Sequence, residues 1–234
     1  MVLALASAAQ AQIITSPQDD YTGPYRLAFF TTDTFSPTNT DIEVYNDYVS
    51  FAATNVAELV ALTGTTWKAI ASTETVNARD NTLTVPSEDP VTTLQPTNYN
   101  SATDFPIYNL SGVRLADNNL DLWYDNTIAD VMTDDAGVRP IPGTVNPRIM
   151  TGTKSDGTLA DFQNGGTNAL WLGGAASDRY VAVTRMFIDD EPFEGGWVMD
   201  YGKGWSLDGA GFRLMAMSSV IPATGVVGTI VEIK

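Results

Sequence analysis

The spacing of apolar positions predicts one long helix early in the chain. From Ile42 to Val60, apolar side chains recur every three or four residues, which is the period of one helical face. Thr40 and Glu43 have the spacing of a capping box, in which each side chain binds the backbone N–H of the other residue. We expect a helix over about 41–62 that turns this apolar face toward the core.

Elsewhere, short apolar runs between Gly, Pro, Asn and Ser residues predict β-structure. The runs that read as strands are 25–30, 67–71, 105–110 and 113–116, the last two joined by a Ser-Gly turn. From residue 149 onward, shorter runs punctuated by Gly indicate irregular β-structure, and 72–104 reads as a long polar loop. The expected fold class is α+β, mostly β, in a single domain over 12–222.

The start of the chain has the pattern of an export signal. Residues 1–11 are uncharged and rich in Ala, and they end in Ala9-Gln10-Ala11, which fits the small-x-small pattern before a signal-peptidase cut. We therefore predict a signal peptide over 1–11, a mature chain that begins near Gln12, and an extracellular or cell-surface location. No other stretch of the sequence is long and apolar enough to span a bilayer.

The end of the chain differs in character from the domain before it. Residues 223–234 form an almost uncharged tail of high β propensity. The side chains predicted to drive association are Val226, Val227, Ile230, Val231 and Ile233. Such a tail either closes the sheet of its own domain or adds a strand to the sheet edge of a neighbouring subunit.

Composition narrows the chemistry that the chain can perform. Its 234 residues include neither His nor Cys, which excludes Ser–His–Asp and Cys–His catalysis, HExxH-type zinc sites and thiol redox chemistry. The net charge of −16 disfavours nucleic acid and anionic membranes as partners. Adjacent acids such as Asp134 and Asp135 are expected to be solvated, so a glycosidase built on paired carboxylates is the weaker alternative. We predict that the protein is not an enzyme.

Calcium is the one cofactor that the residues suggest. The ion takes several oxygen ligands from carboxylates, amides and backbone carbonyls. The candidate ligands are Asp117, Asn118, Asn119 and Asp121, four oxygen-bearing side chains within five residues. A second acidic cluster lies at 189–191. Neither cluster matches an EF-hand, and a polar loop without metal is the alternative interpretation.

The order of elements, with one helix followed by a loop-rich β region that contains several Trp residues, resembles the C-type-lectin-like fold and its endostatin-like relatives. The stretches that carry this resemblance are 66–72, 105–110, 120–123 and 150–157. Residues 25–220 also resemble a group of exported proteins from planctomycetes and other environmental bacteria, many of which carry a C-terminal sorting tail. The resemblance implies a C-type-lectin-like domain with one long N-terminal helix in a secreted bacterial protein.

Three segments depart from these relatives. Sugar-binding C-type lectins hold calcium with a Glu-Pro-Asn loop and a Trp-Asn-Asp strand. Here Phe193 follows Glu-Pro, and Tyr124 stands between Trp and Asp, so both signatures lose their Asn. At 220–222, where a sorting tail would begin, the Glu-Pro pair and the hydrophobic anchor are missing. The resemblance therefore carries over a fold and not a sugar site or a sorting mechanism.

Two functional interpretations from different classes follow. The first is a non-enzymatic structural protein of the cell surface or extracellular matrix, a homo-oligomer or polymer that assembles by strand addition through its tail. A head-to-tail contact of this kind is heterologous and builds a filament unless it closes into a ring. The alternative is a lectin-like module, with or without calcium, that binds glycan or protein through the loops 72–104 and 186–208. Its five Trp residues are expected to be core rather than a sugar platform.

Overall fold

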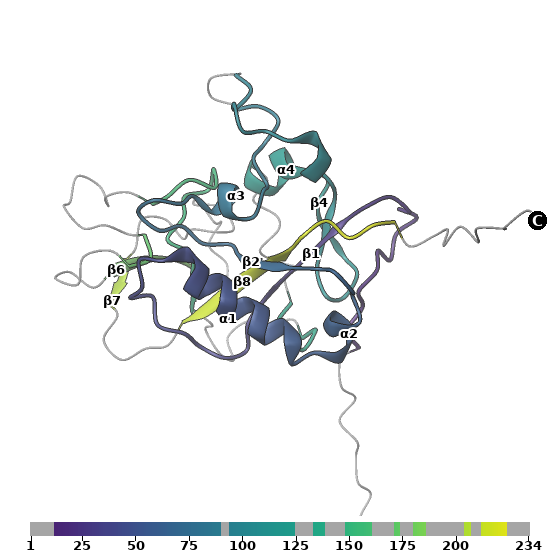
Figure 1. Ribbon diagram of the computed structural model, residues 1–234, viewed down its shortest axis with the longest axis horizontal. Helices are drawn as coiled ribbons and strands as arrows, with labels where there is room; N and C mark the ends of the chain where they lie inside the picture. Colours follow the sequence, from purple (N-terminus) through teal and green to yellow (C-terminus); the bar gives the residue numbers. More distant parts are fainter. Residues whose placement is uncertain are drawn as a thin grey trace, which may run out of the picture.

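The computed structural model of the chain describes residues 12–89, 94–124, 133–138, 148–160, 171–173, 180–185, 204–206 and 212–223. Within these residues one mixed sheet of eight strands packs with a few helices (Figure 1). The helices are α1 (Ile42–Thr54), α2 (Ala57–Val60), α3 (Ala78–Asn81), α4 (Asn119–Tyr124) and the 3-10 turn η1 (Ser101–Thr103). The strands are β1 (Arg26–Phe30), β2 (Trp67–Ala69), β3 (Ile107–Tyr108), β4 (Arg114–Ala116), β5 (Arg148–Met150), β6 (Tyr180–Arg185), β7 (Gly204–Ser206) and β8 (Arg213–Ser218). The expected α+β class is confirmed in this coarse form.

Strand β8, near the end of the chain, lies at the centre of the sheet. The strand order is β4-β3-β1-β8-β5-β6-β7, and β2 also pairs with β8. On one edge β8 runs antiparallel to β1, while on its other edge it runs antiparallel to β2 and parallel to β5 (Figure 1). Both edges of β8 are therefore occupied within the domain.

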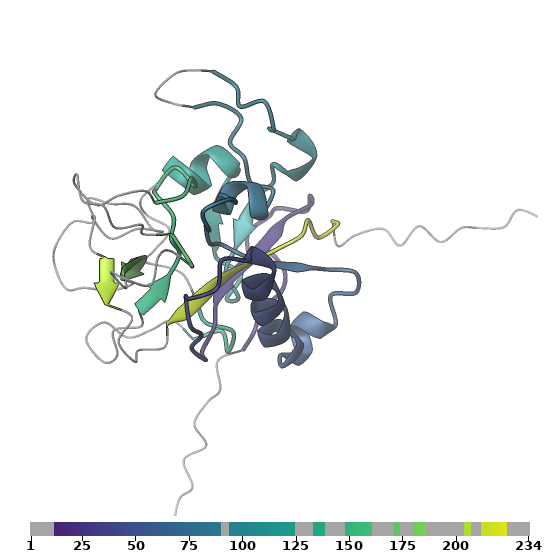
Figure 2. The ribbon, with the colours of Figure 1, turned by 60° about the vertical axis from the view of Figure 1, so that its left-hand side comes forward.

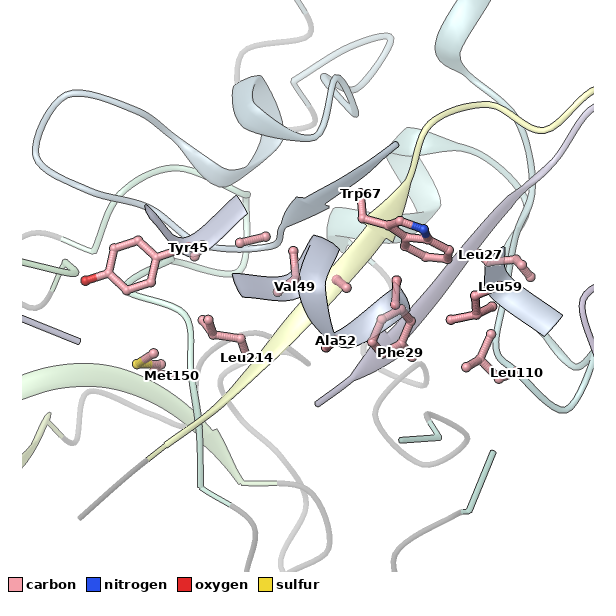
Figure 3. Close-up of a cluster of buried hydrophobic side chains, with 14 of the residues drawn as sticks. Leu27, Phe29, Tyr45, Val49, Ala52, Leu59, Trp67, Leu110, Met150 and Leu214 are labelled. Atoms are coloured by element: carbon pink, nitrogen blue, oxygen red, sulfur yellow. The ribbon is translucent and has the colours of Figure 1, made fainter. Parts of the chain in front are cut away.

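The two faces of the sheet belong to two separate cores. Because successive side chains of a strand point to opposite faces, β1 and β8 contribute to both cores. Leu27 and Leu214 lie in the core that α1 covers, which Figure 3 shows in close-up. Phe30 and Met215 lie in the other core, together with Trp123 of α4. Each large apolar side chain buried in this way contributes roughly 1.5–3 kcal/mol.

The helix predicted over 41–62 is wrong in its extent, because it is interrupted. Helix α1 ends at Thr54, Asn55 follows as its C-cap, and Val56 is extended at φ −114° and ψ 113° before α2 begins. Thr, Asn and Val are all weak helix formers, so three in succession favour a break here. The apolar face is buried as predicted, and Leu59 of α2 packs into the same core (Figure 3).

The predicted capping box is also wrong. Asp41, rather than Thr40, caps α1, since its carboxylate accepts the backbone N–H of Glu43 at 3.0 Å. The amide oxygen of Asn39 accepts the N–H of Asp41 at 2.8 Å and fixes the entry into the helix. The Glu43 carboxylate turns to Lys68 of β2 instead, with 3.1 Å between Nζ and Oε2. Helix α1 is thus capped by an Asx residue and tied to the sheet by an ion pair.

The predicted hairpin is confirmed as β3 and β4, joined by a turn at Gly112. This glycine has φ +73°, and a Cβ there would overlap the side chain of Gln18 and lie 3.0 Å from the carbonyl oxygen of Ser16. The lead-in segment therefore lies directly against the turn. Its Ile14 N–H donates to the Leu110 carbonyl at 2.9 Å, so the first described residues are anchored to the hairpin.

A buried arginine ties β1 to β8 and to the end of α3. Arg26 is 1% exposed, and its guanidinium donates to the carbonyls of Thr82 at 2.7 Å and Ser218 at 3.2 Å. A third, longer bond reaches the carbonyl of Leu83. Burial lowers the pKa of Arg26 to about 10, because removing the guanidinium from water disfavours its charged form. Backbone carbonyl dipoles and the charge of Asp104 stabilise the buried guanidinium.

Side chains close the outer edge of β2. The amide oxygen of Asn46 accepts the N–H of Ala69 at 2.8 Å, and Asn81 donates to the Ala69 carbonyl at 2.7 Å. Ser50 donates its hydroxyl to the Trp67 carbonyl at 3.1 Å. These residues of α1 and α3 replace the neighbouring strand that an edge would otherwise recruit. The β2 edge is consequently not open to strand addition.

We predict that Asn46→Leu lowers the free energy of unfolding by about 1–3 kcal/mol, because it leaves the buried Ala69 N–H without an acceptor. Urea denaturation followed by tryptophan fluorescence measures the change. Asn55→Leu makes the same chemical change at an exposed position and is the matched control. Equal stability of the two variants would contradict the proposed role of Asn46 at the strand edge.

Candidate functional site

The four predicted calcium ligands form the start of α4. The Asn118 amide oxygen accepts the N–H of Asp121 at 2.9 Å, and the Asp121 carboxylate accepts the N–H of Asp117 at 2.8 Å. This reciprocal pair stabilises the first turn in the manner of a capping box. Asn119 lies apart from the other three, since its side chain is fully buried and donates to the Val85 carbonyl at 3.2 Å.

The remaining candidate, Asp117, belongs to an ion-pair network on the hairpin. Its carboxylate lies 2.6 Å from Arg114, whose guanidinium also pairs with Asp19 at 2.7 Å. The rings of Tyr21 and Tyr108 lie 5.4 and 5.5 Å from the Arg114 guanidinium carbon. Burial and the bond that its hydroxyl donates to Asp19 raise the pKa of Tyr108 to about 12. The carboxylate of Asp117 is thus already paired with a cation, which it shares with Asp19.

These contacts give the predicted ligands structural roles in the described part of the chain. Among the described residues, no group of three or more His, Cys, Asp or Glu side chains is placed to hold a metal ion. The second cluster, at 189–191, lies outside the described residues. Calcium binding by Asp117, Asn118, Asn119 and Asp121 stays a prediction.

A different acidic site lies beside α1, where segments distant in the sequence meet. A pocket of about 610 Å³ is bounded by α1, the start of α2, the loop after β1, the turn at 135–138 and the first described residues. Three of its described lining residues are acidic and none is basic: Asp33, Glu58 and Asp135. The ring of Phe51, 63% exposed, forms an apolar rim. The arrangement suits a ligand that carries a positive charge next to an apolar group.

Tyr48 lines the same pocket. Its ring packs on Phe35 at 4.5 Å between centroids, and its buried hydroxyl has no hydrogen-bond partner in the described structure. Burial, with the charges of Asp33 and Asp135, raises the pKa of Tyr48 above its ordinary value.

No pattern in the sequence predicted this acidic pocket. Asp134 and Asp135 were expected to be solvated, yet Asp134 is only 8% exposed and its carboxylate accepts the N–H groups of Ala136 and Val138 at 3.0 and 2.8 Å. Burial raises the pKa of Asp135 as well, and the charge of Asp33 adds to the rise. The sequence shows that each of these segments carries acidic residues. It does not show that the segments lie side by side, because this depends on the fold.

The residues predicted to drive assembly, Val226, Val227, Ile230, Val231 and Ile233, lie outside the described residues. The structure describes the point from which they depart. Ile221 exchanges two backbone hydrogen bonds with Tyr25, of 2.8 and 3.1 Å, and Pro222 and Ala223 are exposed. The chain thus reaches the surface two residues after its last pairing with the sheet.

The loops of the alternative interpretation are described only in part. The first, 72–104, contains α3 and η1, and 90–93 lie outside the described residues. Of the second, 186–208, only β7 is described. Trp67 and Trp123 are buried, as expected for core residues.

Comparisons with known proteins leave the family open. No protein-family model matches the chain, and no curated protein matches it. The resemblance to C-type-lectin-like domains and to exported planctomycete proteins stays a prediction from the quoted stretches. In the described part of the chain, no helix has the length and apolar character needed to cross a membrane.

Two substitutions at Asp121 separate helix capping from calcium binding. We predict that Asp121→Ala lowers the free energy of unfolding by about 1 kcal/mol with or without calcium, because it removes the cap. Asp121→Asn keeps an acceptor oxygen and should stay close to the wild type. Thermal unfolding in EDTA and in millimolar CaCl2 measures both. A calcium-dependent rise in melting temperature that both variants abolish would instead assign Asp121 to an ion.

The acidic pocket predicts a stability that depends on pH. A carboxyl whose pKa is raised by folding stabilises the folded state below its ordinary pKa, and this contribution is lost as the pH rises through the folded pKa. Asp135→Asn, which mimics the protonated form, should therefore melt at a higher temperature than the wild type at pH 7. The gap should close as the pH falls toward 3.8, the ordinary value.

Melting curves between pH 7 and pH 4 test the prediction for Asp135. The exposed Asp20→Asn substitution removes the same charge and controls for the acidity of the whole chain. A gap that is the same at every pH, or equal in the two variants, would show that Asp135 is not held in an unfavourable environment.

Proposed function

We propose that the protein is a secreted, non-enzymatic structural subunit of the cell surface or extracellular matrix. Its C-terminal segment, 224–233, docks on the next subunit and builds a homopolymer. Export rests on the leader pattern of residues 1–11, and the absence of enzymatic activity rests on a sequence without His or Cys.

The observation that carries this proposal is the position of β8. Both of its edges are paired, and Ile221 pairs with Tyr25, just before β1, where the chain reaches the surface. The strand-forming segment that follows is not needed to complete the pairing of β8. We propose that this segment, which has high β propensity, pairs its backbone N–H and C=O groups with a partner.

The charge of the chain is compatible with this assembly. With 28 acidic and 12 basic residues, like subunits repel one another at long range. The segment 224–233 carries one charged residue, Glu232, so its docking adds little further repulsion. Salt screens the long-range term, and assembly is therefore favoured at the ionic strength of an extracellular medium.

A binding module is the second candidate function, and the acidic pocket favours it. The carboxylates of Asp33, Glu58 and Asp135 beside the exposed ring of Phe51 suit a glycan or protein that presents a cation. In this alternative the monomer is the functional form. Saturable binding of a cationic glycan by a monomeric protein, weakened by Asp135→Asn, would support it.

Deletion of the C-terminal segment tests the structural proposal. We expect the mature chain 12–234 to form ordered polymers and the truncated chain 12–223 to stay monomeric with an unchanged melting temperature. Size-exclusion chromatography with light scattering and negative-stain electron microscopy measure assembly, and circular dichroism monitors the fold. A double substitution, Val227→Asp with Ile230→Asp, preserves chain length and should behave like the truncation. Polymers that persist in both altered proteins would overturn the proposal.

A further inference from the structure

We infer that an uncharged groove between α1, α2 and the loop leading into β2 receives the segment 224–233 of a neighbouring subunit. The inference rests on the proposed function and identifies the surface that accepts the segment.

The groove encloses about 480 Å³. Leu59 and Trp67, both nearly buried, form its apolar walls, and Val60 at the rim is 59% exposed. The loop 62–66 completes the lining. Val60 continues the apolar surface of Leu59 and Trp67 to the rim, and a contiguous apolar surface of this kind is one that a partner can cover.

Charge distinguishes this groove from the pocket beside it. None of the described residues that line the groove is charged, whereas the neighbouring pocket presents Asp33, Glu58 and Asp135. The acidic pocket would repel the carboxylate of Glu232 in the segment. A nearly uncharged, apolar segment therefore matches the groove and not the pocket.

The groove also offers hydrogen-bonding groups to an extended backbone. The hydroxyls of Ser50 and Thr54 already donate to the carbonyls of Trp67 and Phe51 at 3.1 and 2.7 Å, so their oxygens can serve a peptide only as acceptors of its N–H groups. Three further hydroxyls, from Thr63, Thr65 and Thr66, line the groove. A peptide backbone that leaves water needs such partners for its N–H and C=O groups.

The sheet edges whose surroundings the structure describes are poorer acceptors. At β2, Asn46, Ser50 and Asn81 already bind the outward backbone groups. Strand β4 is only three residues long, the register shifts within the hairpin, and Arg114 is engaged with Asp19 and Asp117. Short, irregular and charged edges resist strand addition.

The path of the chain favours a neighbour's segment over the chain's own. Ser219 lies beside the groove, since its N–H donates to the Thr66 carbonyl at 2.7 Å. The chain then runs on to Ile221, which pairs with Tyr25 of the lead-in to β1, and the next two residues, Pro222 and Ala223, are exposed. To enter the groove of its own domain, the segment would have to turn back toward Ser219, whereas a fully extended segment of ten residues reaches roughly 35 Å to another subunit.

Val60→Lys tests the groove with little risk to the fold, because this side chain is exposed. In the mature chain 12–234 we expect the critical concentration for polymer formation to rise about tenfold or more. The reason is that docking would bury the charge of the lysine against an apolar segment. Val113→Lys makes the same change on the β3–β4 turn, where Val113 is 45% exposed, and should assemble like the wild type. Thr63→Lys repeats the test in the loop that lines the groove.

The outcomes separate the two claims. If the wild-type protein never assembles, the proposed function is refuted, and so is the claim that the segment of a neighbouring subunit docks in the groove. Polymers that form equally well in Val60→Lys and Thr63→Lys would leave the proposed function standing and refute the groove. Assembly lost in Val113→Lys and kept in Val60→Lys would place the acceptor at the β4 edge. Monomers whose melting temperature falls only in the groove variants would show that the chain's own segment occupies it.

Discussion

Strand β8 is hydrogen-bonded along both edges and buried on both faces, and the rest of the domain is arranged around it. Leu214 and Ala216 enter the core under α1, while Met215 and Met217 enter the core that includes α4. The views of Figures 1 and 2 agree that β8 runs through the middle of the molecule beside β1. Because β8 comes so late in the chain, the sheet cannot close until almost the whole sequence has been made.

This arrangement limits how subunits can associate. The central strands have no unpaired edge, and polar side chains of α1 and α3 close the edge of β2. Surfaces away from the sheet are therefore the natural places for a partner. The two hollows flank the end of α1. The one lined by carboxylates suits a cationic partner, and the one without charged side chains suits an uncharged, apolar partner.

Local patterns predicted much of the fold. The period of apolar residues located α1, and the alternation of short runs located β1, β2 and the β3–β4 hairpin, because each signal lies within a few consecutive residues. The break after Thr54 was missed, since the apolar spacing continues across it. The cluster Asp117–Asp121 suggested a metal because capping and coordination use the same oxygen-bearing side chains. The acidic pocket was invisible because its carboxylates come from three distant segments.

The central claim is that the C-terminal segment of one subunit contacts the groove of another. A photoreactive amino acid placed at position 230, in a mixture of ¹⁴N- and ¹⁵N-labelled subunits, tests this contact directly. After irradiation and mass spectrometry, we expect cross-links to residues 59–66 that join subunits of different isotopic composition. Cross-links confined within single subunits, or directed to the β4 edge, would contradict it.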